Sequence, residues 1–273
     1  MTEVAQRYDS AAADYGRYWA PVLADASLRL LSLVKGPAPT VVLDVGTGAG
    51  ALIFAALRRW PYAEVIGTDA SAGMLDVARR GAAALPAEES RRLRLLHGAA
   101  DRVPVEPASV DLVVSSFVYQ LVPDRPAAFR EALRVLRPRG RLAFVTWIDR
   151  DSQPFPAGDE FDEAVLDLAI EEPDYPPEEV AGDYASAGAA ASQLRRAGFR
   201  DVSARELWLE YRWTLESYLD YKVNYGERAL FRSLGEATAD RLWRRARERL
   251  EVLPPDAFCW RTPVVYAFGS RPG

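Results

Sequence analysis

The stretch Val41 to Ala51, which reads VVLDVGTGAGA, decides the fold. Four apolar residues and one acid lead directly into Gly46, Gly48 and Gly50, and the helix-prone run ALIFAALRRW follows. This order predicts a buried parallel strand, a tight turn and the first turn of a helix, an arrangement that presents backbone N–H groups to a ligand. The glycines lack a Cβ atom, so a ligand can lie directly against the backbone. The simpler interpretation is a turn whose small residues serve only packing.

A second predicted strand, Ala63–Asp69, ends in a carboxylate. Asp69 lies 19 residues after Gly50, the spacing at which a nucleotide-binding strand presents an acid to both ribose hydroxyls. Asp69 can also cap the helix that we expect to begin near Ser71, and this role is compatible with the first.

Asp44 helps to distinguish between adenosine cofactors. Gly46, Gly48 and Ala51 also satisfy the dinucleotide pattern G-x-G-x-x-G/A, so the glycines alone do not exclude NAD. Asp44 lies two residues before Gly46, near the helix N-terminus where a pyrophosphate would lie, and like charges are unfavourable there. The same carboxylate suits a ligand that carries an ammonium group.

Three motifs in this order, DVGTGAG, GTDAS and PASVDLVVSSF, resemble those of the class I S-adenosylmethionine-dependent methyltransferases. The resemblance is strongest to the small-molecule branch that includes the ubiquinone and menaquinone biosynthesis enzymes, and it covers most of residues 8–148. It implies S-adenosylmethionine as the cofactor and S-adenosylhomocysteine as its product. It also implies an α/β fold with a Rossmann-like seven-stranded sheet, mostly parallel with an antiparallel last strand, and helices on both faces.

The resemblance further implies which residues bind the cofactor. A family segment of the form Y-D-x-x-A-x-x-Y closes over the cofactor, and Tyr8, Asp9, Ala12 and Tyr15 match it, with Tyr15 expected near the methionine end. Met74 is expected to cover one adenine face, although an ordinary core methionine would look identical. The implied cofactor-binding residues are Tyr15, Asp44, Gly46, Thr47, Gly48, Gly50, Asp69, Ala70, Met74, Ala99, Ala100, Asp101, Ser115, Ser116 and Phe117.

Residues 98–101 depart from the family pattern. The family usually has G-D-A-E-x-L-P here, with the Asp binding the adenine amino group, and this chain has Ala99 in place of that acid. Either a backbone carbonyl or the displaced Asp101 then contacts the amine, or adenine selection is weaker.

The acceptor side gives weaker signals. A sulfonium methyl group is already activated, so the protein must chiefly hold the acceptor in line with it, which can supply roughly 7–11 kcal/mol. A general base adds about 10²–10⁴-fold if the acceptor is a hydroxyl. We assign no catalytic residue, and Tyr119, Asp149 and Tyr221 are acceptor-side candidates from topology alone. His97, the only histidine, is interpreted as structural.

Composition restricts the class of protein. The net charge of −5 shows no basic field of the kind that holds nucleic acid. The lone Cys259 excludes an internal disulfide, and a single histidine leaves no multi-histidine metal site, so we expect no metal. The start MTEVAQRYDS has no signal-peptide pattern, and no run of 18 apolar residues occurs. We therefore expect a cytoplasmic protein that does not enter a membrane, and its oligomeric state is not predicted.

We expect a single methyltransferase domain over residues 1–273. Pro21 marks the start of the second of two N-terminal helices, and Asp124 caps a helix over Arg125–Leu136. Tyr218, Tyr221 and Tyr225 share one helix face, a stripe more typical of packing than of ligand contact. Further strands are expected at Arg92–His97, Val110–Ser116, Arg141–Trp147, Phe199–Trp213 and Thr262–Gly269. The expected parts are a helical lid (1–36), a cofactor-binding core (37–148), an acidic insertion near the pocket mouth (149–186) and a C-terminal half (187–273) with a helical cap (215–253).

The sequence thus predicts an enzyme that transfers a methyl group from S-adenosylmethionine to O, N or C of a small organic acceptor. One alternative is a methyltransferase-fold protein that binds the cofactor but acts as a cyclase or a scaffold, which is compatible with every motif. A second is an NAD(P)-dependent reductase. Such a reductase needs a catalytic Tyr and Lys at a fixed spacing, and Tyr218 and Tyr221 miss that spacing to Lys222.

Overall fold

The computed structural model describes residues 3–150, 152–171, 173 and 180–273. The chain divides into two compact units: unit 1 comprises Met1–Arg150, Glu178–Leu207 and Pro263–Gly273, and unit 2 comprises Asp151–Pro177 and Trp208–Thr262. The single-domain organisation expected from the sequence stays a prediction. Parts of the expected acidic insertion, residues 151, 172 and 174–179, lie outside the described residues.

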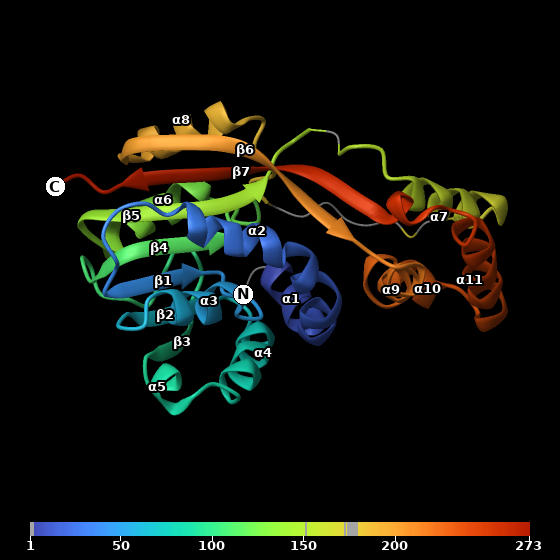
Figure 1. The fold of residues 1–273 in the computed structure, drawn as a ribbon, viewed down its shortest axis with the longest axis horizontal. Coiled ribbons are helices and arrows are strands. Elements are labelled where there is room, and N and C mark those ends of the chain that lie inside the picture. Colours follow the sequence, from blue (N-terminus) through green and yellow to red (C-terminus); the bar gives the residue numbers. More distant parts are fainter. Residues whose placement is uncertain (1–2, 151, 172, 174–179) are drawn as a thin grey trace. The chain divides into compact units, whose positions relative to one another are not determined.

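The chain forms a seven-stranded sheet in the order β3-β2-β1-β4-β5-β7-β6 (Figure 1). Its strands are β1 (Val41–Val45), β2 (Glu64–Asp69), β3 (Leu93–His97), β4 (Val110–Ser116), β5 (Leu136–Trp147), β6 (Arg200–Arg212) and β7 (Cys259–Ser270). The pairs β1–β2, β1–β4, β2–β3 and β4–β5 are parallel, and β5–β7 is antiparallel. The expected sheet is therefore confirmed. Its order also departs from the 3-2-1-4-5-6 order of dinucleotide-binding folds, because β7 enters between β5 and β6.

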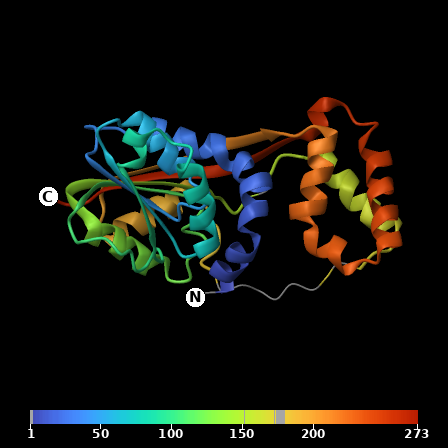
Figure 2. The same ribbon diagram turned by 90° about the horizontal axis from the view of Figure 1, so that it is seen from below.

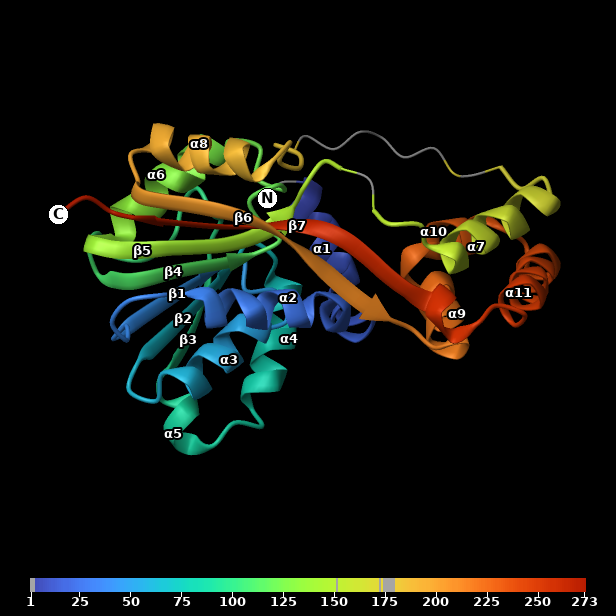
Figure 3. The same cartoon turned by 45° about the horizontal axis from the view of Figure 1, so that its top comes forward.

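Helices cover both faces of the sheet in unit 1. Figure 3 shows α6 and α8 on one face and α2 and α3 on the other. The two expected N-terminal helices are present, and Pro21 lies in the first turn of the second. The helices of unit 1 are α1 (Glu3–Asp14), α2 (Ala20–Leu33), α3 (Ala51–Arg59), α4 (Ala72–Ala82), α5 (Ala87–Ser90), α6 (Arg125–Val135) and α8 (Ala187–Ala197), with a π-helical turn at Tyr15–Trp19 between α1 and α2.

Local sequence signals fix several helix ends. The Ser71 side chain accepts a hydrogen bond from the Met74 N–H and caps α4. Asp124 accepts one from the Ala127 N–H and caps α6, as expected. The left-handed Gly198, with φ of +105°, ends α8. Each of these side chains or glycines satisfies backbone groups that the helix itself leaves open.

Strand β5 begins earlier than the sequence indicates. We expected this strand to begin at Arg141, whereas β5 starts at Leu136. Leu136 pairs with Val110 and Arg141 pairs with Leu112, so the extra residues form a bulge in which Arg139 adopts φ of +64°. The bulge explains the turn-like composition of this segment.

The carboxylate of Asp111 joins the start of β4 to the start of β1. It accepts hydrogen bonds from the Thr40 N–H at 2.8 Å, the Val41 N–H at 2.9 Å and the Arg137 guanidinium at 2.7 Å. Burial raises the pKa of this carboxyl, but the hydrogen bonds from Thr40, Arg137 and Val41 outweigh burial and lower the pKa to about 2.

We expect Asp111→Asn to lower the free energy of unfolding by roughly 1–2 kcal/mol at pH 7, after allowance for solvent screening of this partly exposed group. A depressed pKa stabilises the fold above the unfolded-state pKa, and that contribution is lost as the pH falls toward 2. Urea unfolding at pH 7 and pH 3 measures both effects. The control Asp76→Asn removes an exposed carboxylate paired with Arg79. Equal losses in the two variants would contradict the anchoring role of Asp111.

Unit 2 is helical (Figure 2). Helix α7 packs against α11, and Arg249 of α11 contacts Glu160 and Asp167 of α7. The Trp213 ring lies within 6 Å of the rings of Phe155, Tyr218 and Tyr221 (centroid distances 5.7, 5.6 and 5.5 Å), so Tyr218 and Tyr221 pack within this unit. The helices are α7 (Pro156–Asp167), α9 (Leu215–Tyr221), α10 (Arg228–Ser233) and α11 (Glu236–Leu250). Across the described residues, no helix has both the length and the apolar character of a membrane span.

Candidate active site

A cleft of 140 Å³ lies where β1, β2 and β4 end. Ligands of open α/β sheets bind beyond this carboxyl edge. The sequence-predicted residues on its walls are Tyr15, Gly46, Gly48, Asp69, Ala70, Met74, Ala99, Ala100, Asp101, Ser116 and Phe117. Residues far apart in the sequence therefore meet in one cleft.

A second cavity of 40 Å³ adjoins the cleft. Asp44 and Thr47 line this cavity, and the two cavities share the walls formed by Tyr15, Gly46, Gly48 and Ser116. The Tyr15 ring therefore faces both spaces. An elongated ligand that reaches from Asp69 to Asp44 would have to pass it.

Two predicted cofactor contacts lie elsewhere. Ser115 is fully buried, and its hydroxyl donates a hydrogen bond to the Val45 carbonyl at 2.8 Å. Gly50 begins α3 with φ of +98°, and a Cβ atom there would lie 2.6 Å from the Phe54 ring. The structure does not bring either residue to the cleft, and Gly50 instead serves the turn into α3.

The glycine-rich turn is held by β2. The Thr68 carbonyl accepts hydrogen bonds from the N–H groups of Gly46 and Thr47, both at 2.8 Å. Gly46 and Gly48 have φ of +73° and +52°, in the left-handed region. A Cβ atom on Gly46 would collide with the Val118 side chain, whereas one on Gly48 would meet only Tyr15, at 3.8 Å. The open face of the turn is therefore at Gly48.

This difference predicts unequal effects of two matched substitutions. Alanine at either glycine costs about 1–2 kcal/mol for the left-handed conformation. Gly46→Ala should cost more than Gly48→Ala, because only the first forces Val118 to move. Urea unfolding of both variants gives the two free energies. Equal destabilisation would contradict this description of the turn.

Asp69 closes the other side of the turn. One carboxylate oxygen accepts a hydrogen bond from the Gly48 N–H at 2.8 Å, and the other accepts one from the Ser71 N–H at 2.9 Å. Burial raises the pKa of Asp69, and these two bonds oppose the shift. Each oxygen keeps lone pairs that can accept further hydrogen bonds.

Asp44 is the least satisfied charged group of the site. Its side chain is 1% exposed, and its Oδ1, like the hydroxyl of Thr47, has no hydrogen-bond partner among the described residues. Burial raises the pKa of Asp44 to about 7, the nearby Thr47 side chain opposes this shift, and the charge of Asp69 adds to it. A buried acceptor without a donor is costly, so a cationic ligand beside Asp44 would relieve that cost.

Known proteins resemble this chain in its core. Residues 42–140 match the family model of a methyltransferase domain. A malonyl-[acyl-carrier protein] O-methyltransferase of Xylella fastidiosa is 38% identical over 104 residues, which cover 38% of this chain and 34% of that protein. A demethylmenaquinone methyltransferase of Thermus thermophilus is 37% identical over 114 residues, which cover 42% of this chain and 50% of that protein. These matches span between a third and a half of the relatives.

The structural comparison shows the same fold in a solved protein. The crystal structure of the YcgJ protein of Bacillus subtilis superposes with a TM-score of 0.58 at 21% identity, covering 91% of this chain and 99% of that one. Residues 42–140 therefore form a methyltransferase domain. The resemblance stated from the three motifs is thus confirmed for this part of the chain.

The N-terminal helix is attached to the methyltransferase domain through Asp9. Its Oδ1 accepts hydrogen bonds from the Ser71 hydroxyl at 3.0 Å and from the Gly73 N–H at 2.6 Å, at the N-terminus of α4. These bonds lower the pKa of Asp9, with Gly73 the larger cause. The motif match named Asp9 without a role. The role depends on a residue more than 60 positions away, so no local pattern indicated it.

Of the three acceptor-side candidates, neither Tyr119 nor Asp149 lines the cleft of the methyltransferase domain. Tyr119 is 1% exposed and packs against Phe129 and Phe144 in the core, where burial raises its pKa. Asp149 is exposed at the end of β5. Tyr221 belongs to unit 2, and burial raises its pKa to about 12.

Two aromatic side chains that sequence reasoning missed, Trp147 and Trp19, extend from the predicted Phe117 on the cleft wall. Phe117, which follows β4 with φ of +55°, has its ring centroid 4.3 Å from that of Trp147 at the end of β5. Trp19 follows at 6.4 Å from Trp147. The signal was available, because β5 ends at Trp147 and its parallel neighbour β4 is followed directly by Phe117. Other missed wall residues are Val4, Ala5, Val118, Leu121, Val122 and Pro123.

The loop after β3 leaves one acid on the cleft wall besides Asp69. The Ala99 carbonyl accepts a hydrogen bond from the Arg102 N–H at 3.0 Å. Asp101 lines the cleft. His97 contacts the Ala70 carbonyl at 2.9 Å, a structural role that fits its interpretation from the sequence.

Proposed function

We propose that the protein transfers the methyl group of S-adenosylmethionine to O, N or C of a small organic acceptor. The observation that carries the proposal is Asp44, whose buried carboxylate oxygen has no partner and lies beside an open glycine turn. A ligand with an ammonium group satisfies this oxygen, whereas a pyrophosphate would face a like charge. The fit therefore favours a sulfonium amino acid nucleoside over NAD(P).

Each residue of the cleft then has a distinct role. The Asp69 oxygens, already oriented by Gly48 and Ser71, accept hydrogen bonds from the ribose hydroxyls. Asp44 holds the ammonium group of the methionine part. Met74, 2% exposed on the cleft wall, packs against the adenine ring. The turn from Gly46 to Gly48 lets the ligand approach the backbone.

The lid has the role of excluding water. Tyr15 lies on the walls of both cavities, at the start of a π-helical turn, a geometry often associated with functional sites. We propose that the Tyr15 ring moves aside when the cofactor enters, while Asp9 keeps α1 attached to α4. A closed lid favours methyl transfer to the acceptor over loss of the methyl group to water.

The chemistry itself asks little of the protein. The bound cofactor supplies a methyl group that is activated by a positively charged sulphur. Phe117 and Trp147 provide a rigid apolar surface at the carboxyl ends of β4 and β5, suited to orienting the acceptor. We assign no general base, so positioning is the main contribution, roughly 7–11 kcal/mol.

Asp101 is our candidate for contact with the adenine amino group in place of the missing acid at position 99. S-inosylhomocysteine has a carbonyl where S-adenosylhomocysteine has the amine. If Asp101 contacts the amine, Asp101→Ala should reduce the discrimination between the two ligands, as measured by calorimetry. Unchanged discrimination would favour a backbone carbonyl.

The function is tested by product mass. Purified protein is incubated with S-adenosylmethionine and a panel of small acceptors that carry hydroxyl, amine or activated carbon groups. An acceptor that gains CH₂, together with S-adenosylhomocysteine, supports the proposal. Cofactor binding with an isomerised product of unchanged mass supports a cyclase, and binding without any turnover supports a scaffold.

A further inference from the structure

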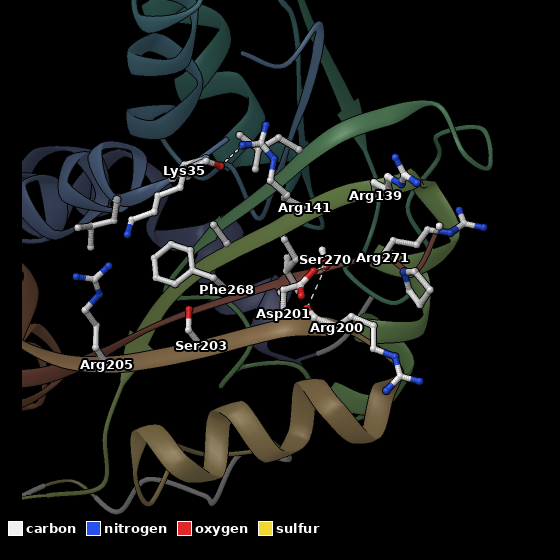
Figure 4. Close-up of a pocket in the computed structure, with 18 residues that line it drawn as sticks. Lys35, Arg139, Arg141, Arg200, Asp201, Ser203, Arg205, Phe268, Ser270 and Arg271 are labelled. Carbon is white, nitrogen blue, oxygen red and sulfur yellow. Dashed lines mark hydrogen bonds between the residues drawn. The ribbon is translucent and has the colours of Figure 1, made fainter. Parts of the chain in front are cut away.

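Unit 1 contains another, larger cavity at the other edge of the sheet. It has a volume of 690 Å³ and lies between the end of α2, the first residues of β5 and β6, and the last residues of β7 (Figure 4). The cofactor cleft lies at the carboxyl ends of the parallel strands, whereas this cavity lies beside the amino end of β5. Nothing in the proposed methyl transfer uses it.

The walls of this cavity are strongly basic. Six cationic side chains line it against a single acid, Asp201, in a chain whose net charge is −5. The cations are Lys35, Arg139, Arg141, Arg200, Arg205 and Arg271. The chain as a whole carries more acids than bases, so the positive charge of this cavity comes from the local arrangement of its residues.

The cations are not neutralised by the protein. The Arg141 guanidinium donates to the backbone carbonyls of Lys35 and Pro37, and that of Arg271 donates to the Leu136 carbonyl. Asp201 accepts a hydrogen bond from the Ser270 hydroxyl at 2.6 Å. Within the part of the chain that the structure describes, none of the six cations forms an ion pair with a carboxylate, and burial lowers the pKa of Arg141.

The cations occupy two ends of the cavity. Figure 4 shows Lys35 and Arg205 reaching toward one end, and Arg139, Arg200 and Arg271 at the other. Phe268 lies on the wall beside Arg205, whose guanidinium carbon is 5.8 Å from the ring centroid. Leu33 and Val34, both half-buried, add apolar surface. The cavity thus combines an apolar wall with separated positive charges.

We propose that this cavity binds a ligand that joins two phosphate groups to a flat ring, of the nucleoside diphosphate class. Guanidinium groups match phosphate oxygens in geometry and charge. The volume lies within the roughly 300–1,000 Å³ of small-molecule sites. A single carboxylate or phosphate would leave most of the cations unneutralised, and a ring can pack against Phe268 and the apolar wall.

The test is titration calorimetry of the whole chain with uridine diphosphate. This probe lacks adenosine, and saturating S-adenosylhomocysteine is present so that the cofactor cleft is filled. We expect binding that weakens as salt increases, and weaker binding of inorganic phosphate or uridine alone. The double substitution of Arg139→Ala with Arg200→Ala removes two exposed cations and should weaken binding about tenfold or more.

A matched control separates a site from general charge attraction. Arg58→Ala with Arg80→Ala changes the net charge equally, at exposed ends of α3 and α4 that do not line the cavity. The control should bind uridine diphosphate like the parent chain. Absence of binding at millimolar ligand, wild-type affinity of the cavity variant, or equal losses in both variants would each overturn the proposal. None of these outcomes depends on methyl transfer.

Discussion

Asp69→Ala is expected to weaken S-adenosylhomocysteine binding by roughly 2–4 kcal/mol, or about 30- to 1,000-fold. The range corresponds to the loss of two hydrogen bonds to a charged acceptor. Asp69 also orients Gly48 and Ser71 through bonds of 2.8 and 2.9 Å, so its removal loosens the turn that contacts the ligand. Calorimetry with purified, ligand-free protein measures the change directly.

Two companions make the Asp69 result interpretable. Asp69→Asn keeps the shape of the side chain but replaces one acceptor oxygen with a donor NH₂ group, so we expect an intermediate loss of S-adenosylhomocysteine affinity. Asp76→Ala removes an exposed acid on the following helix and should leave binding unchanged. A thermal melt of each variant shows whether the fold is intact. Wild-type affinity in a folded Asp69→Ala variant would contradict the proposal that Asp69 binds the ribose hydroxyls.

The fold was predictable because its deciding signals are local. The apolar run before Gly46 marks β1, and short runs of the same kind mark β2 and β4, whose residues Val65 and Val113 are fully buried. Side chains buried on both faces of a parallel sheet must be apolar wherever the strand lies. Helix caps such as Asp124 were equally local. The bulge at Arg139 was missed, because register depends on the partner strand rather than on the segment itself.

The site was only partly predictable, because side-chain surroundings are not local. Tyr119 follows β4 closely, but its side chain packs into the core against Phe129 and Phe144. The contact of Phe117 with Trp147 required knowing that β4 and β5 are neighbours. The basic cavity draws its cations from positions 35 to 271, and no window of sequence contains them. Spacing thus indicated the residues near the turn and not those across strands.

Asp44→Asn is expected to stabilise the ligand-free protein while impairing it as a cofactor binder. The pKa of Asp44 rises from its usual 3.8 to about 7 on folding. With about 1.36 kcal/mol for each pKa unit, the ionised carboxylate costs the folded state about 4 kcal/mol above pH 7. A neutral amide of the same shape avoids this cost, because it carries no charge to desolvate.

The pH dependence gives the sign of the effect. A raised pKa means that the folded state retains the proton, so wild-type stability is undiminished below the unfolded-state pKa and falls as the pH rises toward 7. The gain from Asp44→Asn should therefore be small at pH 4 and full at pH 8, as measured by urea unfolding. The pKa of Asp111 is shifted in the opposite direction, so Asp111→Asn should lower the free energy of unfolding at pH 8, and this variant serves as the control.

The same substitution separates stability from binding. An ammonium group beside Asp44 favours the ionised carboxylate, so S-adenosylhomocysteine affinity in the wild type should decline about tenfold for each pH unit below 7, where binding must first remove a proton. Asp44→Asn should bind weakly at every pH and lose that slope. A variant that is more stable at pH 8 but binds the cofactor like the wild type would show that the carboxylate has no part in holding the methionine end. A variant that is neither more stable nor weaker in cofactor binding would contradict the description of Asp44 as a buried carboxylate without a hydrogen-bond donor.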